Sequence, residues 1–279
     1  MKLTVLVDNN TLIDRYFLGE PGVCYFIETG DRKILFDVGY SDAFLTNARK
    51  LSIDMLDVDT VVLSHGHADH TWGLMPLVYL YTEAILEDHH VRKPTLVMHP
   101  LTLSSKKLDG SLEIGSALTK QRLSGYFDLA LSREPVEITE GLVFLGEIER
   151  TNDFEAQRPL GTTGDSGIEE DDFLFDDSAL AYKSEKGLVI ITGCSHAGIC
   201  NIVEHAKKVC NDDRVIDIIG GFHLLDPPVE QLQGTVAYME GLHLPVLHAC
   251  HCTDLKSKIA LSTVADLEEV GVGLTLAYP

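Results

Sequence analysis

Long apolar runs are missing from this 279-residue sequence, although hydrophobic residues make up 45% of it. No stretch approaches the roughly 18 to 20 uninterrupted apolar residues that a membrane-spanning helix requires, so we expect no membrane association. The segment from Met1 to Asp8 becomes polar too soon for a secretory signal peptide. We therefore expect a cytoplasmic protein whose apolar residues form a core.

Basic residues are also scarce. The sequence has 22 lysines and arginines against 43 aspartates and glutamates, which gives a formal net charge of -21. A protein this acidic repels nucleic acid and anionic membrane surfaces, so we expect a small-molecule substrate and no nucleic-acid partner. None of the six cysteines forms a Cys-x-x-Cys pair, so buried free thiols are expected rather than a disulfide framework.

One short segment carries most of the side chains that suit a metal ion. Residues 64–70 contain His65, His67, Asp69 and His70, directly after a β-branched run that predicts a buried strand and before a predicted helix. His65 and His67 are separated by one residue and can point the same way to share one ion. Asp69 and His70 then point elsewhere and can serve a second ion.

Three more histidines each follow a predicted strand. His196 follows strand 188–192, His223 follows strand 215–219, and His251 follows strand 245–249. Because two ions need ligands from more than one loop, we expect a site with two divalent transition-metal ions. Imidazole and carboxylate ligands favour zinc, with iron or manganese as alternatives. The predicted metal ligands are His65, His67, Asp69, His70, His196 and His251.

The role of His223 has two interpretations. It is a further metal ligand, or it is an unligated imidazole that acts as a general acid for the leaving group. We favour the second, because His196 and His251 already supply one extra imidazole for each ion. Asp69 has a catalytic role as well, since its carboxylate can orient or deprotonate the attacking water.

The motif His65-x-His67-x-Asp69-His70 resembles the signature of the metallo-β-lactamase superfamily. The stretch 35–39, with Asp37 at a strand end, resembles a second feature of that superfamily. The stretches 193–199 and 251–253 resemble a narrower branch, which includes archaeal dihydropterin synthases and uncharacterised metal-dependent hydrolases. The resemblance covers most of the chain and implies the four-layer αββα sandwich of this superfamily.

The predicted elements agree with that α/β (α+β) fold class. Strands dominate the first part of the chain, and strands alternate with helices after residue 178, so two mixed sheets covered by helices would bury every apolar face. We expect a single metallo-β-lactamase-like domain over residues 1–279. The stretch 151–177 is rich in glycine and acids, and we predict a mobile lid there rather than a packed element.

Three further residues have open roles. Many relatives place a bridging aspartate where this chain has Cys194-Ser195-His196. Of these, Cys194 is a soft metal ligand or, as we favour, a buried thiol. Asp37 is expected to orient a ligand imidazole through its second nitrogen. Arg150 binds a phosphate or carboxylate of the substrate, or it forms an ion pair with Glu147 or Glu155.

The resemblance implies three functions. The first is a metal-dependent hydrolase in which a metal-bound hydroxide attacks a small-molecule ester or phosphoester. The second is a dihydropterin synthase-like transferase that joins a pterin methyl diphosphate to an aryl ribosyl phosphate. The third is a metal-binding protein without turnover. We favour the hydrolase, because the strongly acidic chain does not suit two phosphorylated substrates.

Overall fold

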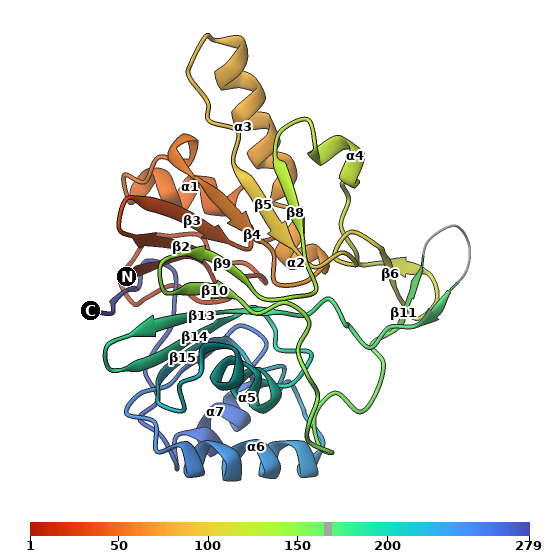
Figure 1. Ribbon diagram of the computed structural model, residues 1–279, viewed down its shortest axis with the longest axis vertical. Coiled ribbons are helices and arrows are strands. Elements are labelled where there is room, and N and C mark those ends of the chain that lie inside the picture. The colour runs from red at the N-terminus through yellow and green to blue at the C-terminus, as the bar shows by residue number, and fades with distance from the viewer. Residues whose placement is uncertain (165–168) are drawn as a thin grey trace.

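The computed structural model describes residues 1–164 and 169–279. Two large β-sheets lie face to face, with helices on the outer face of each (Figure 1). This arrangement is the αββα sandwich that the sequence predicts. The two chain termini lie close together at one edge of the molecule (Figure 1).

The first sheet has seven strands in the spatial order β17-β1-β2-β3-β4-β5-β8. Strands β3, β4, β5 and β8 run parallel to one another, whereas β1 is antiparallel to both of its neighbours. The strands are β1 Lys2–Val7, β2 Cys24–Thr29, β3 Arg32–Phe36, β4 Thr60–Val62, β5 Thr95–Met98, β8 Asp128–Leu131 and β17 Thr275–Ala277.

The second sheet has six strands in the order β16-β15-β14-β13-β10-β9, and β14, β15 and β16 are parallel. Its strands are β9 Val136–Thr139, β10 Leu142–Phe144, β13 Ala179–Ser184, β14 Gly187–Thr192, β15 Val215–Gly221 and β16 His248–Cys250. A smaller third sheet, in the order β12-β11-β6-β7, contains β6 Ser105–Leu108, β7 Leu112–Glu113, β11 Thr162–Gly164 and β12 Glu170–Asp171.

The alternation of side chains along each strand explains the layers. In β14, Ile190 belongs to the core under the helices, while Val189 and Ile191 belong to the core between the sheets. Leu35 and Phe36 of β3 divide in the same way, so each sheet is apolar on both faces. Such strands are stable only when both faces are covered.

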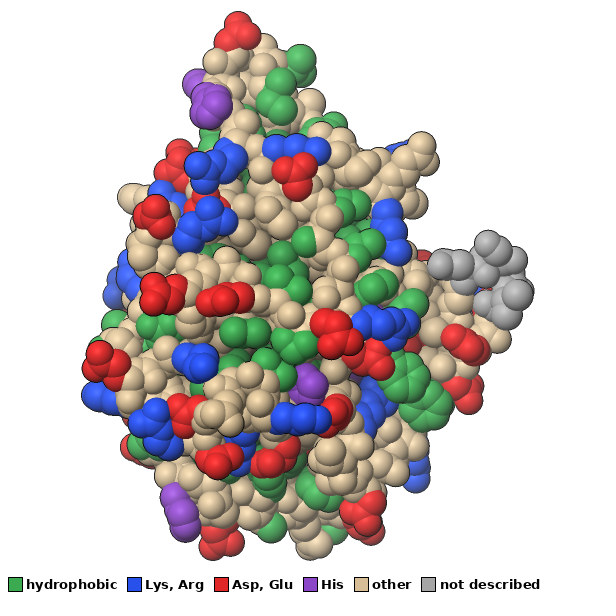
Figure 2. Space-filling view, in the orientation of Figure 1, with side chains coloured by type: hydrophobic (Ala, Val, Ile, Leu, Met, Phe, Trp, Pro, Cys, Tyr) green, Lys and Arg blue, Asp and Glu red, His purple; other side chains and the backbone are tan. Residues whose placement is uncertain are grey.

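The helices lie on the two outer faces. Apolar residues of α1 Ala43–Lys50 and α3 Leu74–Leu86 pack on the first sheet, and those of α5 Ile199–Cys210 and α6 Val229–Leu242 pack on the second. Short helical segments are α2 Ala68–Thr71, α4 Lys120–Leu123, α7 Leu255–Leu261 and the 3₁₀ turn η1 Met55–Asp57. On the face shown in Figure 2, acidic and basic side chains are interspersed with apolar ones.

The stretch 151–177 differs from the predicted lid in its described part. It contributes β11 and β12 to the third sheet, and Glu155, Leu174 and Asp176 are buried. The Glu155 carboxylate accepts backbone N–H groups of Cys200 and Asn201 at the start of α5. These residues are therefore packed, because their acids pair with buried donors, whereas residues 165–168 of the predicted lid lie outside the described residues.

Candidate metal centre

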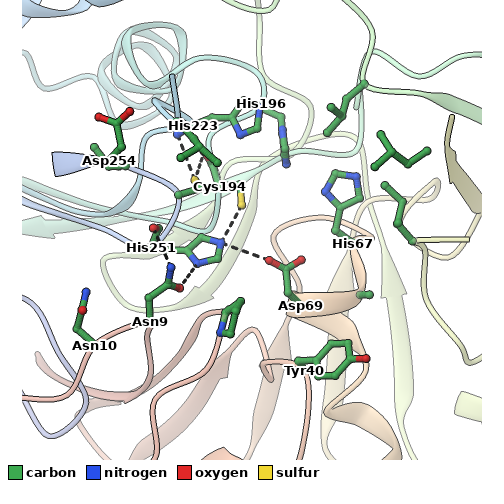
Figure 3. Close-up of a pocket in the computed structure, with 18 of the residues that line it drawn as sticks. Asn9, Asn10, Tyr40, His67, Asp69, Cys194, His196, His223, His251 and Asp254 are labelled. Carbon is green, nitrogen blue, oxygen red and sulfur yellow. Dashed lines mark hydrogen bonds and ion pairs between the residues drawn. The ribbon is translucent and has the colours of Figure 1, made fainter. Parts of the chain in front are cut away.

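The predicted site residues gather where strands of the two large sheets end. The loop after β4 carries His65, His67 and the start of α2, which holds Asp69 and His70. Residues that follow β14, β15 and β16 supply Cys194 with His196, then His223, then His251. Figure 3 shows six of these side chains on the wall of one cavity, namely His67, Asp69, Cys194, His196, His223 and His251. His65 and His70 are buried behind this wall and do not line the cavity. The cavity has a volume of about 940 Å³.

A first group of donor atoms consists of His65, Cys194 and His196, whose candidate ligand atoms all lie within 4.8 Å of one another. The His67 ring lies beside this group, with its centroid 4.7 Å from that of His65 and 4.8 Å from that of His196. His67 Nδ1 faces His65 Nε2 at 3.1 Å. His67 is therefore a neighbour of the first group and a fourth candidate ligand beside it.

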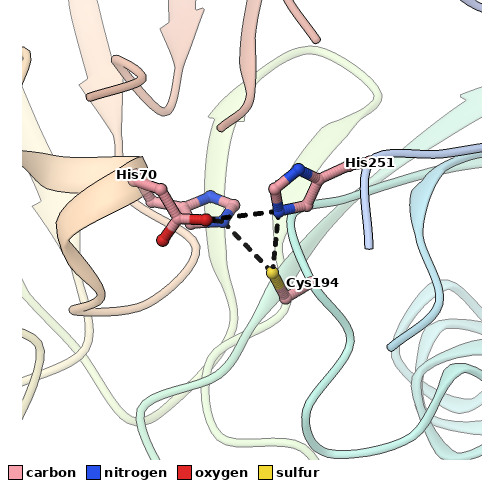
Figure 4. Close-up of side chains that lie close together, drawn as sticks. His70, Cys194 and His251 are labelled. Carbon is pink, nitrogen blue, oxygen red and sulfur yellow. Dashed lines mark hydrogen bonds and ion pairs between the residues drawn. The ribbon is translucent and has the colours of Figure 1, made fainter. Parts of the chain in front are cut away.

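A second group consists of Asp69, His70, Cys194 and His251. The Cys194 sulfur lies 3.2 Å from His70 Nε2 and 3.2 Å from His251 Nε2 (Figure 4). Asp69 Oδ2 lies 3.4 Å from His251 Nε2 and 3.6 Å from His70 Nε2. Cys194 is thus common to both groups.

The donor atoms fit a tetrahedral transition-metal ion. Typical metal–nitrogen and metal–sulfur distances of about 2.0–2.1 Å and 2.3 Å place two ligands of one ion roughly 3.3 to 3.6 Å apart. The separations in the second group, from 3.2 to 3.6 Å, match that spacing. In the first group, His67 Nε2 and His196 Nε2 are buried and have no hydrogen-bond partner among the described residues. Buried polar atoms without partners indicate a missing ligand or ion.

Burial and neighbouring charges divide the imidazoles into two kinds. Burial lowers the pKa of His65 and His196 well below the ordinary value, and it lowers the pKa of His67 to about 4. These three rings are neutral at pH 7 and can coordinate an ion through a lone pair. Burial also lowers the pKa of His70, but the carboxylates of Asp69 and Asp37 outweigh it and raise that pKa to about 9.

The same carboxylates favour any cation at the second group. Burial raises the pKa of Asp69, but His70 and His251 outweigh this effect and hold the pKa well below its usual range. Burial raises the pKa of the Cys194 thiol. A metal ion in this place replaces the proton on the thiol and the second proton on His70, because each ligand must offer a lone pair.

Residues outside the two groups fix the orientation of the imidazoles. Asp37 accepts a hydrogen bond from His70 Nδ1 at 2.7 Å, as the sequence predicts for this aspartate. Asn9 Oδ1 lies 3.1 Å from His251 Nδ1, and Asp8 accepts the His251 backbone N–H. These contacts leave Nε2 of His70 and His251 directed at Cys194.

His223 lies beside the first group on the cavity wall. Its ring centroid is 4.3 Å from that of His196, and its Nδ1 is a further buried atom without a partner in the described part of the chain. Burial lowers the pKa of His223, but Cys252 and nearby carboxylates raise it more, so that the net shift is upward. A protonated imidazole in this position can donate a proton or a hydrogen bond into the cavity.

A sequence-family model described as the metallo-beta-lactamase superfamily matches residues 18–256. The chain belongs to this superfamily. It is also 30% identical over 268 residues to the 7,8-dihydropterin-6-methyl-4-(beta-D-ribofuranosyl)-aminobenzene-5'-phosphate synthase of Methanocaldococcus jannaschii, covering 92% of this chain and 89% of that protein.

Solved structures of other superfamily members share the fold. The crystal structure of Tm1679, described as a metal-dependent hydrolase of the beta-lactamase superfamily, is 28% identical, covers 99% of this chain and 98% of its own, and has a TM-score of 0.83. Zinc-bound PqqB of Methylobacterium extorquens is 12% identical, and the match covers 99% of this chain and 100% of PqqB with a TM-score of 0.57. At this low identity, the comparison with PqqB shows the fold alone.

Arg150 is a predicted site residue of this superfamily member that does not line the cavity. Its guanidinium Nη2 donates to the backbone carbonyls of Phe173 and Leu174 and the group lies 4.7 Å above the Phe175 ring, while Nε is buried and has no partner among the described residues. The substrate-binding role of Arg150 stays a prediction. The alternative ion pairs with Glu147 and Glu155 are not formed among the described contacts.

Sequence reasoning missed Asn9 and favoured a buried thiol for Cys194. Asn9 follows β1 by two residues, so it obeys the same rule of polar residues at strand ends that singled out the histidines. Cys194 follows β14 by two residues and has the same signal.

No helix in the described residues is both long and apolar enough to cross a membrane.

Proposed function

We propose that this superfamily member is a metal-dependent hydrolase that cleaves a small-molecule ester or phosphoester. The observation that carries the proposal is that two groups of metal-binding donors meet at Cys194 on the wall of an open cavity. Divalent ions, most simply zinc, would supply Lewis acidity there and lower the pKa of a water molecule to about 7. The proposed ligands are His65, His67, Asp69, His70, His196, His251 and also Cys194.

Two residues have proposed roles beyond ligation. The Asp69 side chain is 32% exposed, so its carboxylate is within reach of water in the cavity and would orient the attacking molecule. His223 lines the same cavity and would hold a proton for the leaving group. These roles need no side chain from outside the described cavity.

The cavity wall supports a largely apolar substrate with few negative charges. Much of the lining is apolar, including Tyr40, Ile114, Leu160 and Leu225. Of the described residues that line the cavity, Lys258 is the only lysine or arginine. The mixed charges on the surface in Figure 2 likewise support a small molecule rather than nucleic acid. Cytoplasmic location and the absence of a membrane partner stay predictions.

We expect Lys258 to bind one anionic group of the substrate. Lys258→Ala should raise KM about tenfold for an ester that carries a carboxylate, because a charge-assisted hydrogen bond is lost. KM for a neutral ester of similar size should not change. Lys256→Ala is the matched control, since Lys256 is exposed on the same helix and does not line the cavity. Equal effects of the two variants would contradict the role.

A second candidate function rests on a separate observation. The similarity to the dihydropterin synthase covers nearly the full length of both proteins. A transferase that joins a pterin methyl diphosphate to an aryl ribosyl phosphate would use the same two groups of donors to neutralise the departing diphosphate. The single cationic side chain in the described lining favours the hydrolase, because two phosphorylated substrates would need more cations.

The function is tested with protein reconstituted with zinc. Such protein should release p-nitrophenol from at least one of a panel of p-nitrophenyl carboxyl esters, phosphomonoesters and phosphodiesters. His65→Ala and His67→Ala should lose both metal and activity. If metal-loaded protein hydrolyses no probe but forms the pterin product, detected by mass spectrometry, the transferase replaces the hydrolase. Full metal content with neither reaction favours a binding protein without turnover.

A further inference from the structure

Cys194 occupies a position between the two groups of donors. It follows β14, is 4% exposed and points its sulfur between the rings of His70 and His251 (Figure 4). A buried thiol of purely structural function needs one hydrogen-bond partner at most and otherwise packs against apolar neighbours. Cys194 instead has two imidazole nitrogens at 3.2 Å.

The sulfur belongs to both groups by distance. Within each group, the candidate ligand atoms lie within 4.8 Å of one another, and the Cys194 sulfur is the atom that the groups share. His65 and His196 belong to the first group, and His70 and His251 belong to the second. A thiolate has several lone pairs and can bind two soft or borderline cations at about 2.3 Å each.

An independent observation points to an ion on the first side. His67 and His196 are 6% and 8% exposed, and the Nε2 atom of each lacks a partner among the described residues. His65 Nε2 has His67 Nδ1 as its neighbour rather than a carboxylate. Within the first group, the shared sulfur is the donor that can carry a negative charge, whereas the nearest described carboxylate, that of Asp177, lies 4.0 Å from His65 Nδ1 and outside the group.

We propose that Cys194 binds both metal ions at once as a bridging thiolate. The inference rests on the proposed metal site, and it replaces the bridging carboxylate expected of many superfamily members with sulfur. On metal binding, the S–H bond of Cys194 breaks, one proton passes to solvent, and two metal–sulfur bonds form. No oxidant or reductant is needed, because the sulfur keeps its oxidation state.

The number of sulfur ligands per metal ion tests the bridge. In protein with two zinc ions, X-ray absorption should give about one sulfur per zinc if Cys194 bridges and about 0.5 if it binds one ion only. Cys252→Ser is the matched control, because Cys252 lines the same cavity but is absent from both groups of donors. The control should keep the ratio of the unaltered protein, and Cys194→Ser should abolish sulfur ligation.

Cobalt binding gives a second readout, which is taken first on the unaltered protein and then on a variant. Titration of the metal-free protein with Co²⁺ should produce a thiolate-to-cobalt charge-transfer band that changes through both equivalents. Cys194→Asp should lose the band but keep two ions, because a carboxylate can also bridge. A band complete at one equivalent, or two bound ions without a band, overturns the bridge and leaves the proposed hydrolase intact. Failure to bind any metal overturns both.

Discussion

Asp37 links the two groups of donors, directly to His70 and through the Ser64 hydroxyl to His65. It accepts from His70 Nδ1 and from the Ser64 hydroxyl, both at 2.7 Å, and that hydroxyl lies 2.9 Å from His65 Nδ1. Because the hydroxyl gives its only hydrogen to Asp37, it must accept from His65 Nδ1. His65 consequently presents an unprotonated Nε2, and His70 would present one when an ion replaces the second proton that its pKa of about 9 keeps on the ring.

Asp37→Asn should weaken metal binding 10- to 100-fold, which is the usual effect of removing a carboxylate that orients ligand histidines. Competition with a chromogenic chelator measures the change. Asparagine tolerates the positive φ of 53° at this position, so the backbone is not the cause of any loss. The control is Asp217→Asn, since Asp217 makes the same contact with His248, which is not a proposed ligand. Equal losses in both variants would argue against the orienting role.

His223→Ala should keep its metal but lose roughly 10² to 10⁴-fold in turnover, the usual contribution of a general acid. Steady-state kinetics and metal analysis on the same preparation measure both quantities. His243→Ala provides the control, because His243 ends α6 and does not line the cavity. Loss of metal in His223→Ala would instead make His223 a ligand, and unchanged turnover would leave it no catalytic part.

The third sheet is the secondary-structure element that supports the histidine loop. Lys106 of β6 is buried and binds Asp172 at 3.0 Å and Asp176 at 2.8 Å. Asp176 also accepts the backbone N–H of Gly66, between the first two histidines. A Cβ added at Gly66 would lie 2.1 Å from the Thr102 carbonyl oxygen. The histidine loop therefore packs closely against the segment that leads into β6.

Lys106→Met should lower the free energy of unfolding by about 3–5 kcal/mol, because two buried carboxylates lose their cation. Chemical denaturation measures the loss. The adjacent Lys107 pairs with Glu169 on the surface, and Lys107→Ala should change stability little. A small effect of Lys106→Met would show that the acids find other partners or take up protons.

Sequence patterns predicted the long elements and missed this sheet for a physical reason. The strands β1 to β5 and β13 to β15 are apolar runs with a clear period, whereas β6 and β11 are short and polar. Their pairing joins Lys107 to Thr162 and Lys106 to Thr163, which are far apart in the sequence. Helix α7 ends at Leu261, where the chain turns, and Leu267 then forms a bridge with Leu247.

Contacts across the whole molecule add what sequence reasoning does not see. Cys194 and His70 are 124 positions apart, and their 3.2 Å contact is the observation that makes Cys194 a candidate ligand. Arg150 contacts backbone carbonyls, which have no sequence signature. The six predicted metal ligands lie close together in the structure because histidines and acids at strand ends do have such a signature.

Metal removal should destabilise the whole molecule, since the proposed ligands come from loops of both large sheets. With free zinc at 100 times Kd, bound metal stabilises the fold by roughly 2.7 kcal/mol. A chelator should therefore lower Tm by about 5–10 °C in a chain of this size. The variant His65→Ala/His67→Ala should show a much smaller shift. An unchanged Tm in the original chain would mean that the folded protein does not bind the ions more tightly than the unfolded chain does, which contradicts the proposed site.

The separation of the ligands along the chain also sets the order of events when the protein is synthesised. His65 to His70 leave the ribosome long before Cys194 and His251, which are needed to complete either group of donors. At on the order of 5–20 residues per second, roughly 10 to 35 seconds pass between the first and last ligands. During that interval the nascent histidine loop offers only partial sites to passing ions, so the correct metal is selected after the second sheet has formed.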